Sequence, residues 1–507
     1  METTKPSKRK CDDFFRVMKR DRLALSFDDV RMIPCYSEVL PNETDISSRF
    51  SMNVGLRIPI VSAAMDTVTE HKMAITMAKL GGLGIIHKAL SAKDQATAVG
   101  KVKYFLNGFI PDPICVSADN TVGEVLKYRA EKEFKFFSFM VNDEAGNKVG
   151  LVTHDDFIFC PDKEKLISEI MSTDMIFAGQ DVSIAEVHSI MMTKRKKVLP
   201  IFSTAGEFKG IYTLSDVERT LGGDSHGYNL DANGSLRVGA AIGTGSDMKE
   251  RMELLSRHRV DVVVVDTAHG DSKGVVKTVK FCKKNYPHID VVAGNVCTGD
   301  AAKMLVDAKA DGIKVGVGPG SICTTRIVAG IGVPQLTAIY ECEKAIRGSG
   351  IPICADGGIE NSGDVALAMS LVDSVMMGKL LAGTKESPGE IVYRDGRPMK
   401  MYRGMGSMEA LLANQASRER YGQDGVANDK LIPEGVKAWL NYKGEVAPIV
   451  FSLTGGLKDS LGYLGAKNIE VFHKQADFNR MTSGGLIESH PHGLDSIDKE
   501  NNITTKR

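Results

Sequence analysis

The sequence predicts an α/β protein built on a (β/α)8 TIM barrel, interrupted by an insert of α+β type. Eight short apolar segments that end in small or polar residues are separated by segments with helical periodicity. Eight such units predict a closed parallel barrel. A duplicated unit of about sixty residues stands between the second and third units. A doubly wound open sheet is the competing fold, but no G-x-G-x-x-G sequence follows a first strand.

The barrel elements are predicted from apolar runs and from the spacing of apolar residues. The eight strands are expected within residues 58–66, 81–88, 237–243, 260–270, 289–296, 312–316, 351–359 and 373–379. Helices are expected at about 70–80, 248–258, 299–309, 335–348 and 362–370. Side chains that follow the strands should gather at one mouth of the barrel, where TIM-barrel active sites lie.

The insert contains an internal repeat. Residues 116–125 resemble residues 178–187, and residues 150–156 match residues 210–216. Each copy should hold a strand, a helix and a hairpin. A Gly-x-x-Thr-x-x-Asp spacing places a hydroxyl and a carboxylate at a strand-to-helix turn, where they can hold a ribose or simply cap the next helix. These pairs are Thr153 with Asp156 and Thr213 with Asp216.

Length and composition restrict the class of protein. A chain of 507 residues predicts about two to four domains. Lys plus Arg and Asp plus Glu both number 64, so the charge gives no indication of a nucleic-acid partner. No apolar run reaches the ~18 residues of a membrane span. Nine cysteines without a C-x-x-C pair favour reduced thiols and a cytoplasmic location, with nuclear and organellar locations left open.

The predicted domain boundaries follow these patterns. They are a disordered N-terminal tail at 1–22, a first barrel segment at 23–112, the insert at 113–228 with repeats of about 113–170 and 171–228, a second barrel segment at 229–493 and a disordered tail at 494–507. Within the second barrel segment, residues 408–435 are polar and glycine-rich, which predicts either a mobile flap or an ordinary surface loop.

The candidate site centres on a glycine-rich loop, residues 316–326, that follows the sixth strand and delivers Cys323. A thiol on such a loop is either a nucleophile or a small buried residue in a tight turn. Glycines after the sixth, seventh and eighth strands leave backbone amides accessible and favour a phosphate-bearing ligand.

Four motifs make the chain resemble the inosine-5′-monophosphate (IMP) dehydrogenase family, in the form with a tandem cystathionine-β-synthase (CBS, or Bateman) insert. They are residues 62–68, 316–325, 355–359 and 402–407, and the resemblance covers about 23–493. It implies NAD-dependent oxidation of IMP to xanthosine 5′-monophosphate (XMP), the committed step of guanine nucleotide synthesis. It also implies NAD and K⁺ as cofactors, purine nucleotides at the insert, and a homotetramer with an octamer as a further alternative.

The resemblance also implies the roles of individual residues. Cys323 would be the nucleophile, and Arg420, Tyr421, Thr325 and Glu434 would activate water. IMP would contact Ser62, Met65, Ser321, Asp356, Gly358, Gly378, Lys379, Tyr402, Gly404, Met405, Gly406 and Glu434. NAD would meet Asp266, Thr267, Ala268, Asn295, Gly316 and Gly318. Potassium would bind carbonyls of Gly316, Gly318 and Cys323, with Glu488, Ser489 and His490 of a neighbouring subunit. The CBS nucleotide residues would be Thr153, Asp156, Thr213 and Asp216.

Two other functions remain as alternatives. Guanosine-5′-monophosphate (GMP) reductases share the barrel and the cysteine loop but use NADPH to deaminate their substrate. Arg420, Tyr421 and Glu434 favour the dehydrogenase, because hydrolysis of a covalent intermediate needs a water-activating group. A nucleotide-sensing protein with an inert barrel is disfavoured by the presence of Cys323 and the flap residues.

Overall fold

The computed structural model describes residues 8–106, 109–110, 113–131, 137–179, 182–222 and 227–494. The chain forms two compact units, Met1–Lys103 with Ser225–Arg507, and Tyr104–Asp224. Residues 1–7 and nearly all of the predicted C-terminal tail lie outside the described residues. Within the described chain, no helix is long and apolar enough to cross a membrane.

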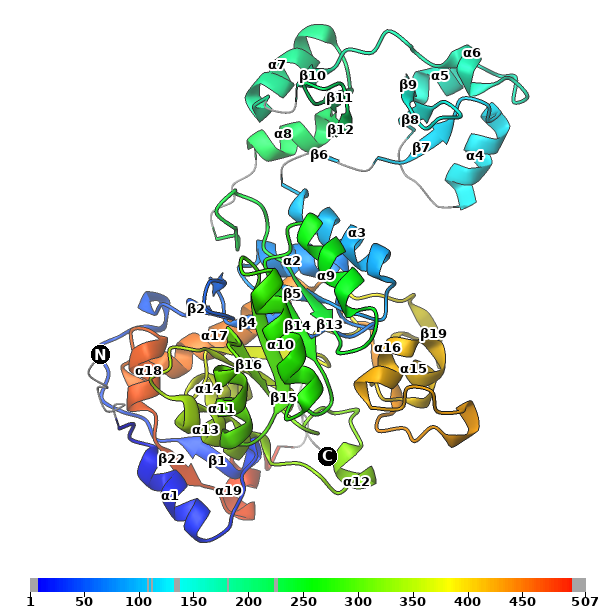
Figure 1. Cartoon of the computed structure of the whole chain (residues 1–507). Coiled ribbons are helices and arrows are strands. Elements are labelled where there is room, and N and C mark those ends of the chain that lie inside the picture. Colours follow the sequence, from blue (N-terminus) through cyan, green and yellow to red (C-terminus); the bar gives the residue numbers. More distant parts are fainter. Residues whose placement is uncertain are drawn as a thin grey trace. The chain divides into compact units, whose positions relative to one another are not determined.

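The larger unit is a closed barrel of eight parallel strands (Figure 1). In barrel order the strands are β4 (Ile60–Ser62), β5 (Leu83–Ile86), β13 (Gly239–Ile242), β14 (Val262–Asp266), β15 (Asp290–Val296), β16 (Gly312–Val315), β17 (Ile353–Asp356) and β18 (Ser374–Met377). Pairing of β18 with β4 closes the ring. Each strand lies within a predicted segment, and the predicted (β/α)8 barrel is confirmed.

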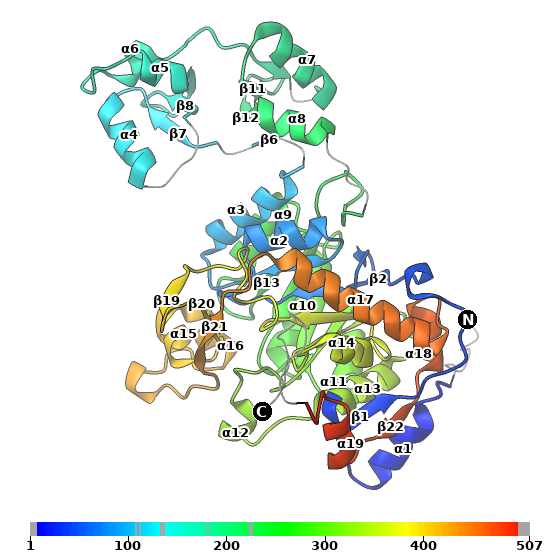
Figure 2. The same cartoon turned by 180° about the vertical axis from the view of Figure 1, so that it is seen from behind.

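Helices follow the barrel strands along the chain. They are α2 (His71–Lys79), α3 (Ala92–Lys103), α9 (Met248–Arg257), α10 (Lys273–Asn285), α11 (Gly299–Asp307), α12 (Thr325–Val328), α13 (Gln335–Ile346), α14 (Ser362–Met369) and α17 (Val446–Leu464). In Figure 2 α17 lies against α14, which it contacts. The helices predicted from periodicity are all present.

Apolar side chains fill the barrel. Val61, Leu83, Val264 and Val292 share one cluster with Phe50, from the turn between β2 (Ser48–Arg49) and β3 (Gly55–Leu56). Because the interior is a packed core and not a pore, a ligand must bind at an end of the barrel.

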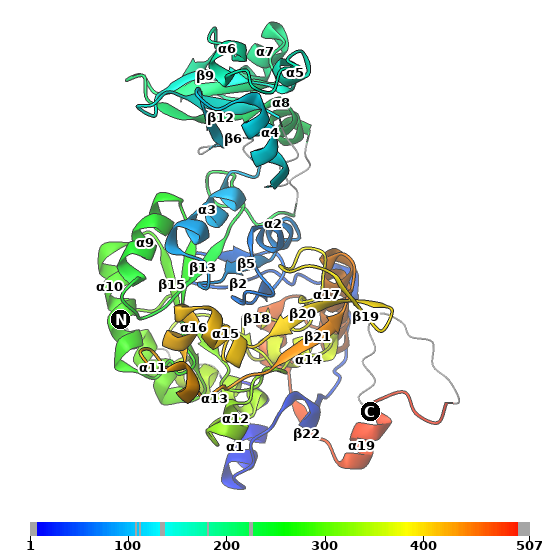
Figure 3. The ribbon, with the colours of Figure 1, turned by 90° about the vertical axis from the view of Figure 1, so that its right-hand side faces the viewer.

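A further layer carries the predicted flap. It consists of β19 (Val392–Arg394), β20 (Arg397–Arg403), β21 (Lys437–Asn441), α15 (Met408–Ala413) and α16 (Gln415–Arg420), which group together in Figure 3. Asn414 begins α16, since its side chain accepts a hydrogen bond from the Ser417 backbone N–H at 2.8 Å. The polar sequence of this region therefore contains two short helices in place of a continuous loop.

The prediction of a disordered N-terminal tail is wrong for residues 12–20. They form α1 (Asp12–Arg20), which belongs to the barrel unit. The Phe15 ring stacks on Tyr340 of α13 with a centroid separation of 3.8 Å, and Arg347 pairs with Asp12 at 2.8 Å. Contacts with α13, more than 300 positions away in the sequence, supply the apolar burial that this charged segment lacks alone.

The remaining C-terminal elements pack beside the start of the chain. They are α18 (Ile469–Gln475), β22 (Phe478–Arg480) and α19 (Ser483–Glu488). Strand β22 pairs with β1 (Val30–Met32), so the two ends of the barrel unit share a small sheet.

The smaller unit contains two similar halves. The first comprises β7 (Cys115–Ser117), α4 (Val122–Glu131), β8 (Phe139–Asn142), β9 (Lys148–Val152), α5 (His154–Ile158) and α6 (Ile167–Ile170). The second comprises β10 (Ala178–Gly179), α7 (Ile184–Lys194), β11 (Val198–Phe202), β12 (Phe208–Thr213) and α8 (Leu214–Gly222). In each half the first two strands pair in parallel, and the second and third strands form an antiparallel hairpin. The unit begins at Tyr104 and not at residue 113, because β6 (Phe109–Ile110) pairs with β12.

Candidate active site

A cavity lies at the C-terminal ends of the barrel strands, and most of the predicted site residues line it. Those residues are Met65, Asp266, Thr267, Ala268, Asn295, Gly316, Gly318, Cys323, Thr325, Asp356, Gly378, Tyr402, Gly404, Met405, Arg420, Tyr421 and Glu434. They come from segments up to about 370 positions apart in the chain. The barrel topology therefore collects into one site side chains that the sequence presents separately.

The loop after β16 holds Cys323 at this cavity. Gly316 has φ +153°, and a side chain there would collide with the carbonyl of Asp356. The Cys323 backbone N–H donates to the Gly320 carbonyl at 3.0 Å, which makes a tight turn. The thiol then lies 3.2 Å from the Thr325 hydroxyl oxygen. The nucleophile candidate is thus partly exposed and next to a second candidate group.

The other cysteines have different surroundings. All nine cysteines fall within the described residues and none forms a disulfide, yet Cys323 is the one that lines the cavity. Burial raises the pKa of Cys282 and Cys354 to about 12, so these thiols stay protonated near neutral pH. The alternative that Cys323 is a buried turn residue does not describe its position.

The flap segment covers the cavity and reaches the barrel. The Arg420 guanidinium forms a close ion pair with Asp266, at the end of β14. The Ala268 backbone N–H donates to the Arg420 carbonyl at 3.2 Å. A side chain at Gly406 would collide with the ring of Tyr421, so glycine leaves room for that ring. Arg420 and Tyr421 therefore occupy the mouth of the barrel beside Asp266.

A charged residue of the site, Lys314, was not predicted. Lys314 lies in β16, is 2% exposed, and its Nζ is 3.0 Å from Asp266 and 2.5 Å from Asp356. It also contacts Asn295, whose amide nitrogen donates to Asp356 at 2.9 Å. A lysine inside an otherwise apolar strand was the available signal, because buried lysines need a partner.

Polar and sulfur-containing groups shape the opposite side of the cavity. Tyr402 is 4% exposed, and burial raises its pKa while its hydroxyl bonds Ser321. A Cβ at Gly378 would lie 2.7 Å from that hydroxyl and 3.1 Å from the Met65 sulfur. Behind them Arg403 donates to Asp66 at 3.0 Å. Glycine at 378 thus keeps backbone amides accessible beside a phenol.

Other predicted residues lie outside the cavity lining. Ser62 is fully buried and accepts a hydrogen bond from Thr69 at 2.8 Å. Lys379 pairs with Glu360 at 3.2 Å. Gly358 lies against Pro319, and Gly406 lies under Tyr421. Ser489 and His490 line a separate cavity with Asp28 and Arg31, and Glu488 precedes them at the end of α19.

The cavity is smaller than a usual ligand pocket. Its volume is about 140 Å³. Ligand pockets usually measure about 300–1,000 Å³. Arg420 and Tyr421 line this space, so their positions limit what the cavity can hold in this structure.

Comparison with known proteins gives the family. Residues 24–492 match the IMP dehydrogenase / GMP reductase domain. The chain belongs to the IMP dehydrogenase / GMP reductase family. An inosine-5′-monophosphate dehydrogenase of Aquifex aeolicus is 46% identical over 94% of this chain and 97% of its own length. One of Bacillus subtilis is 42% identical over 96% and 99%.

A solved structure of the same family has a similar fold. The structure of a cysteine-to-alanine variant of GMP reductase from Trypanosoma brucei, in complex with guanosine 5′-monophosphate, has a TM-score of 0.77 and 37% identity. The match covers 93% of this chain and 98% of that one. The IMP dehydrogenase / GMP reductase domain therefore includes members of both activities, and the site residues must distinguish them.

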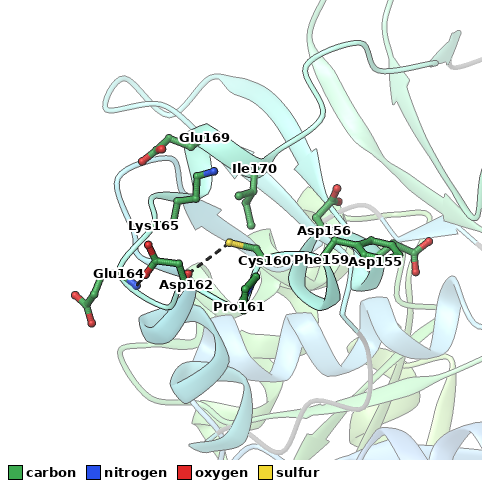
Figure 4. A pocket seen from close by; sticks show the side chains of 10 residues that line it. All are labelled: Asp155, Asp156, Phe159, Cys160, Pro161, Asp162, Glu164, Lys165, Glu169 and Ile170. Atoms are coloured by element: carbon green, nitrogen blue, oxygen red, sulfur yellow. Dashed lines mark hydrogen bonds between the residues drawn. The ribbon is translucent and has the colours of Figure 1, made fainter.

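The insert of this family member has a second cavity of about 650 Å³. Figure 4 shows its lining, which has five carboxylates and one lysine; the carboxylates are Asp155, Asp156, Asp162, Glu164 and Glu169. Such a surface repels phosphates. In the first half Thr153 and Asp156 form a capping box, with Oγ1 donating to the carboxylate at 2.8 Å, and Thr213 bonds Asp216 at 2.6 Å in the second. The capping interpretation of both pairs is thus supported, and a nucleotide role stays a prediction.

Proposed function

We propose that this chain oxidises IMP to XMP with NAD⁺, as the resemblance to IMP dehydrogenases implies. One observation carries the choice within the family: Arg420 and Tyr421 lie over the cavity that Cys323 lines, with Glu434 beside them. A dehydrogenase must hydrolyse its covalent intermediate, whereas a reductase has no such step. A docked pair of polar flap residues supports hydrolysis.

In the proposed reaction the Cys323 thiolate adds to purine C2 of IMP and forms a C–S bond. C2 then transfers a hydride, with its electron pair, to NAD⁺, which leaves as NADH. Dividing the oxidation in this way replaces one difficult step with easier ones. The cavity supports it, because Cys323 is accessible and Tyr402, Gly378 and Met405 surround the space where a nucleotide would lie.

The second half of the reaction is hydrolysis of the thioimidate. Water adds to C2, a flap base takes its proton, and the C–S bond breaks to return the thiolate and release XMP. Arg420 with Tyr421, or Thr325 with Glu434, would accept the proton. An arginine base requires a site that favours neutral guanidine, since its ordinary pKa is above about 12.

The charges around Asp266 support its role toward NAD. With the flap docked, Asp266 and Asp356 face two cations, Lys314 and Arg420. When Arg420 withdraws, Asp266 loses one ion-pair partner. Its carboxylate can then accept hydrogen bonds from the hydroxyl groups of the cofactor ribose. Thr267, Ala268 and Asn295 line the same end of the cavity. One carboxylate would thus hold the cofactor and the flap in turn.

We further propose a potassium site and a tetramer. Carbonyls of Gly316, Gly318 and Cys323 are neutral oxygen ligands of the kind a monovalent cation takes. Ser489 and His490 line a different cavity of the same chain, which supports a contribution of Glu488, Ser489 and His490 from a neighbouring subunit. A site built from both sets is incomplete without a second subunit. Within the described residues no cluster of His, Cys, Asp or Glu side chains offers a competing metal site.

The insert is proposed to be a tandem CBS module that binds purine nucleotides. Its two halves share strand order and hairpins, and apolar residues including Met140, Val198 and Ile211 join them. Nucleotide contacts by Thr153, Asp156, Thr213 and Asp216 require those pairs to bind ligand as well as cap their helices.

An activity assay tests the main proposal. Purified protein with IMP and NAD⁺ should produce NADH, and intact mass analysis should find a nucleotide on one thiol. NADPH consumption with GMP and release of ammonia would instead identify a GMP reductase. Neither reaction, with nucleotide binding retained, would identify a sensor with an inert barrel.

A further inference from the structure

Arg326 spans the two ends of the loop that carries Cys323. It lies in α12, between the Cys323 turn and the start of α13. Its Nε and one terminal nitrogen donate to the Val317 carbonyl at 3.3 and 3.2 Å. The same terminal nitrogen donates to the Val333 carbonyl at 2.6 Å. Val317 follows β16 and Val333 precedes α13, so one guanidinium joins the segment that leaves the barrel to the segment that returns.

Apolar packing does not hold the outer side of this loop. All of residues 327–332 are exposed, and Ile327 is 85% exposed. The inner side is attached by backbone, since the Val436 N–H donates to Ile322 at 2.9 Å and the Thr324 N–H donates to Glu434 at 3.0 Å. Those bonds involve the flap segment, which must move. On the outer side, Arg326 provides the charge-assisted hydrogen bonds that do not depend on the flap.

Two glycines leave space for the Arg326 side chain. A Cβ at Gly318 or at Gly332 would lie 2.7 Å from the Arg326 Cγ, closer than carbon atoms approach. Both glycines also have positive φ, +79° and +156°. The aliphatic stem therefore fills the interior of the loop while the planar guanidinium bonds carbonyls at both ends.

We propose that Arg326 is a positioning residue that keeps the Cys323 loop at its working geometry while the flap opens and closes. The inference rests on the proposed function, because it assigns to Arg326 the placement of the thiol against purine C2. Covalent chemistry requires the reacting atoms to be held closely, and a shift of about 1 Å costs about 10²-fold in rate. Loss of the bridge should therefore slow thiol addition without removing any group that touches IMP.

The test is single-turnover NADH formation in Arg326→Ala, with enzyme saturated by IMP and NAD⁺. We expect the NADH burst to slow about 10²-fold, with the KM for IMP nearly unchanged and partial recovery on adding guanidinium at non-denaturing concentration. The matched control is Arg257→Ala, an exposed arginine paired with Glu253 on α9. An unchanged burst, or a slow burst that guanidinium does not restore, overturns the proposal. If unaltered enzyme makes no NADH, the proposed function fails instead.

A second variant keeps the test valid if Arg326→Ala does not fold. Gly332→Ala retains the guanidinium but displaces its stem. It should slow the same step, whereas Gly330→Ala, also at a positive-φ position of this loop but with open space around its Cβ, should not. Equal NADH burst rates in Gly332→Ala and Gly330→Ala would overturn the proposal.

Discussion

At the scale of single residues, Cys323 differs from the other thiols by exposure and by its neighbours. It lies on a glycine-rich turn next to Thr325 and faces the barrel cavity, whereas Cys11, Cys282 and Cys354 have a pKa raised by burial to about 12. A thiolate is the reactive form of cysteine. Position within the fold, more than residue type, therefore selects the nucleophile.

Cys323→Ala is expected to abolish NADH production and leave nucleotide binding by the insert intact. The reason is that alanine cannot form the covalent bond on which hydride transfer depends. Steady-state assay and nucleotide binding to the full chain measure the two effects. Cys160→Ala, which removes a thiol from the insert, should keep full activity. Near-normal turnover of Cys323→Ala would reject the assigned nucleophile.

Lys314→Met should destabilise the barrel and weaken the affinity for NAD⁺. The substitution leaves the half-buried Asp356 without its cation and the buried Asp266 with Arg420 alone, and breaking a buried pair costs about 3–5 kcal/mol. Urea unfolding and dinucleotide titration measure the two losses. Lys303→Met, at an exposed position on α11, is the control. Equal stability of the two variants would contradict the assigned role of Lys314.

At the scale of elements, α15, α16 and the segment up to residue 435 form a lid over the strand ends. Arg420 docks on Asp266, while Lys88, which follows β5, lies beneath the lid with no hydrogen-bond partner among the described residues. A cation buried without a partner disfavours closure. The lid is thus held by the Arg420–Asp266 ion pair and by backbone hydrogen bonds such as that from the Ala268 N–H to the Arg420 carbonyl, and burial of the Lys88 cation opposes its closure.

Arg420→Ala should slow hydrolysis more than hydride transfer. Hydride transfer needs an open cofactor site, whereas water activation needs the docked flap, so a covalent enzyme-nucleotide adduct should accumulate. Intact mass analysis during turnover detects the adduct, and the NADH burst reports hydride transfer. Equal slowing of both steps would count against a flap role in hydrolysis.

Flap closure should become more favourable as pH rises from about 8 toward 10. Burial, followed by the nearby Arg420 charge, lowers the pKa of Lys88 to about 8, against about 10.4 for an exposed lysine. Other charged groups that face Lys88 are Glu419, Asp247 and Arg251. The closed form binds fewer protons in this window, so rising pH favours it, and below about 8 the dependence disappears.

Competition with the cofactor provides the measurement. Because a docked flap blocks the space beside Asp266, apparent affinity for a non-reactive NAD analogue should fall between about pH 8 and 10. Lys88→Met should remove that slope. A slope that persists in the variant would show that another group titrates.

At the scale of the whole molecule, a cluster of ion pairs lies in the barrel unit near the points where the chain leaves for the insert and returns from it. Its central residue is a buried lysine. Lys103, the last residue of α3, is fully buried and lies 2.8 Å from both Asp231 and Asp261. Asp261 also accepts the Val238 backbone N–H at 2.8 Å. Lys103 and Asp231 lie near the two ends of Tyr104–Asp224 in the sequence, so their ion pair joins the chain on either side of the insert.

Lys103→Met should destabilise the barrel by about 3 kcal/mol, because it leaves the mostly buried Asp261 without its cation and Asp231 with only the more exposed Arg259. Fluorescence of the single tryptophan, Trp439 in β21, reports unfolding of the barrel unit in urea. Lys101→Met changes an exposed lysine on the same helix and should unfold like the unaltered chain. Equal urea concentrations at the unfolding midpoint of Lys103→Met and Lys101→Met would refute this role of the cluster.

Local sequence patterns were sufficient for the barrel and for much of the site. Each strand combines a run of apolar residues with a small or polar ending. Each glycine-rich turn is indicated by its glycines, because glycine adopts backbone conformations that other residues avoid. The same reasoning missed Lys314 and the docking of α1. Their stability comes from partners about 40 to more than 300 positions away, such as Asp356 and Tyr340.

The sequence by itself determined the eightfold repeat, the position of the insert and the loop that presents Cys323, because these depend on periodicity and on short-range backbone geometry. Only the tertiary structure decided that Arg420 meets Asp266, that Lys314 lies between two carboxylates and that Arg326 bridges Val317 to Val333. Ion pairs and hydrogen bonds depend on distance in space, and the closure of the barrel sets that distance.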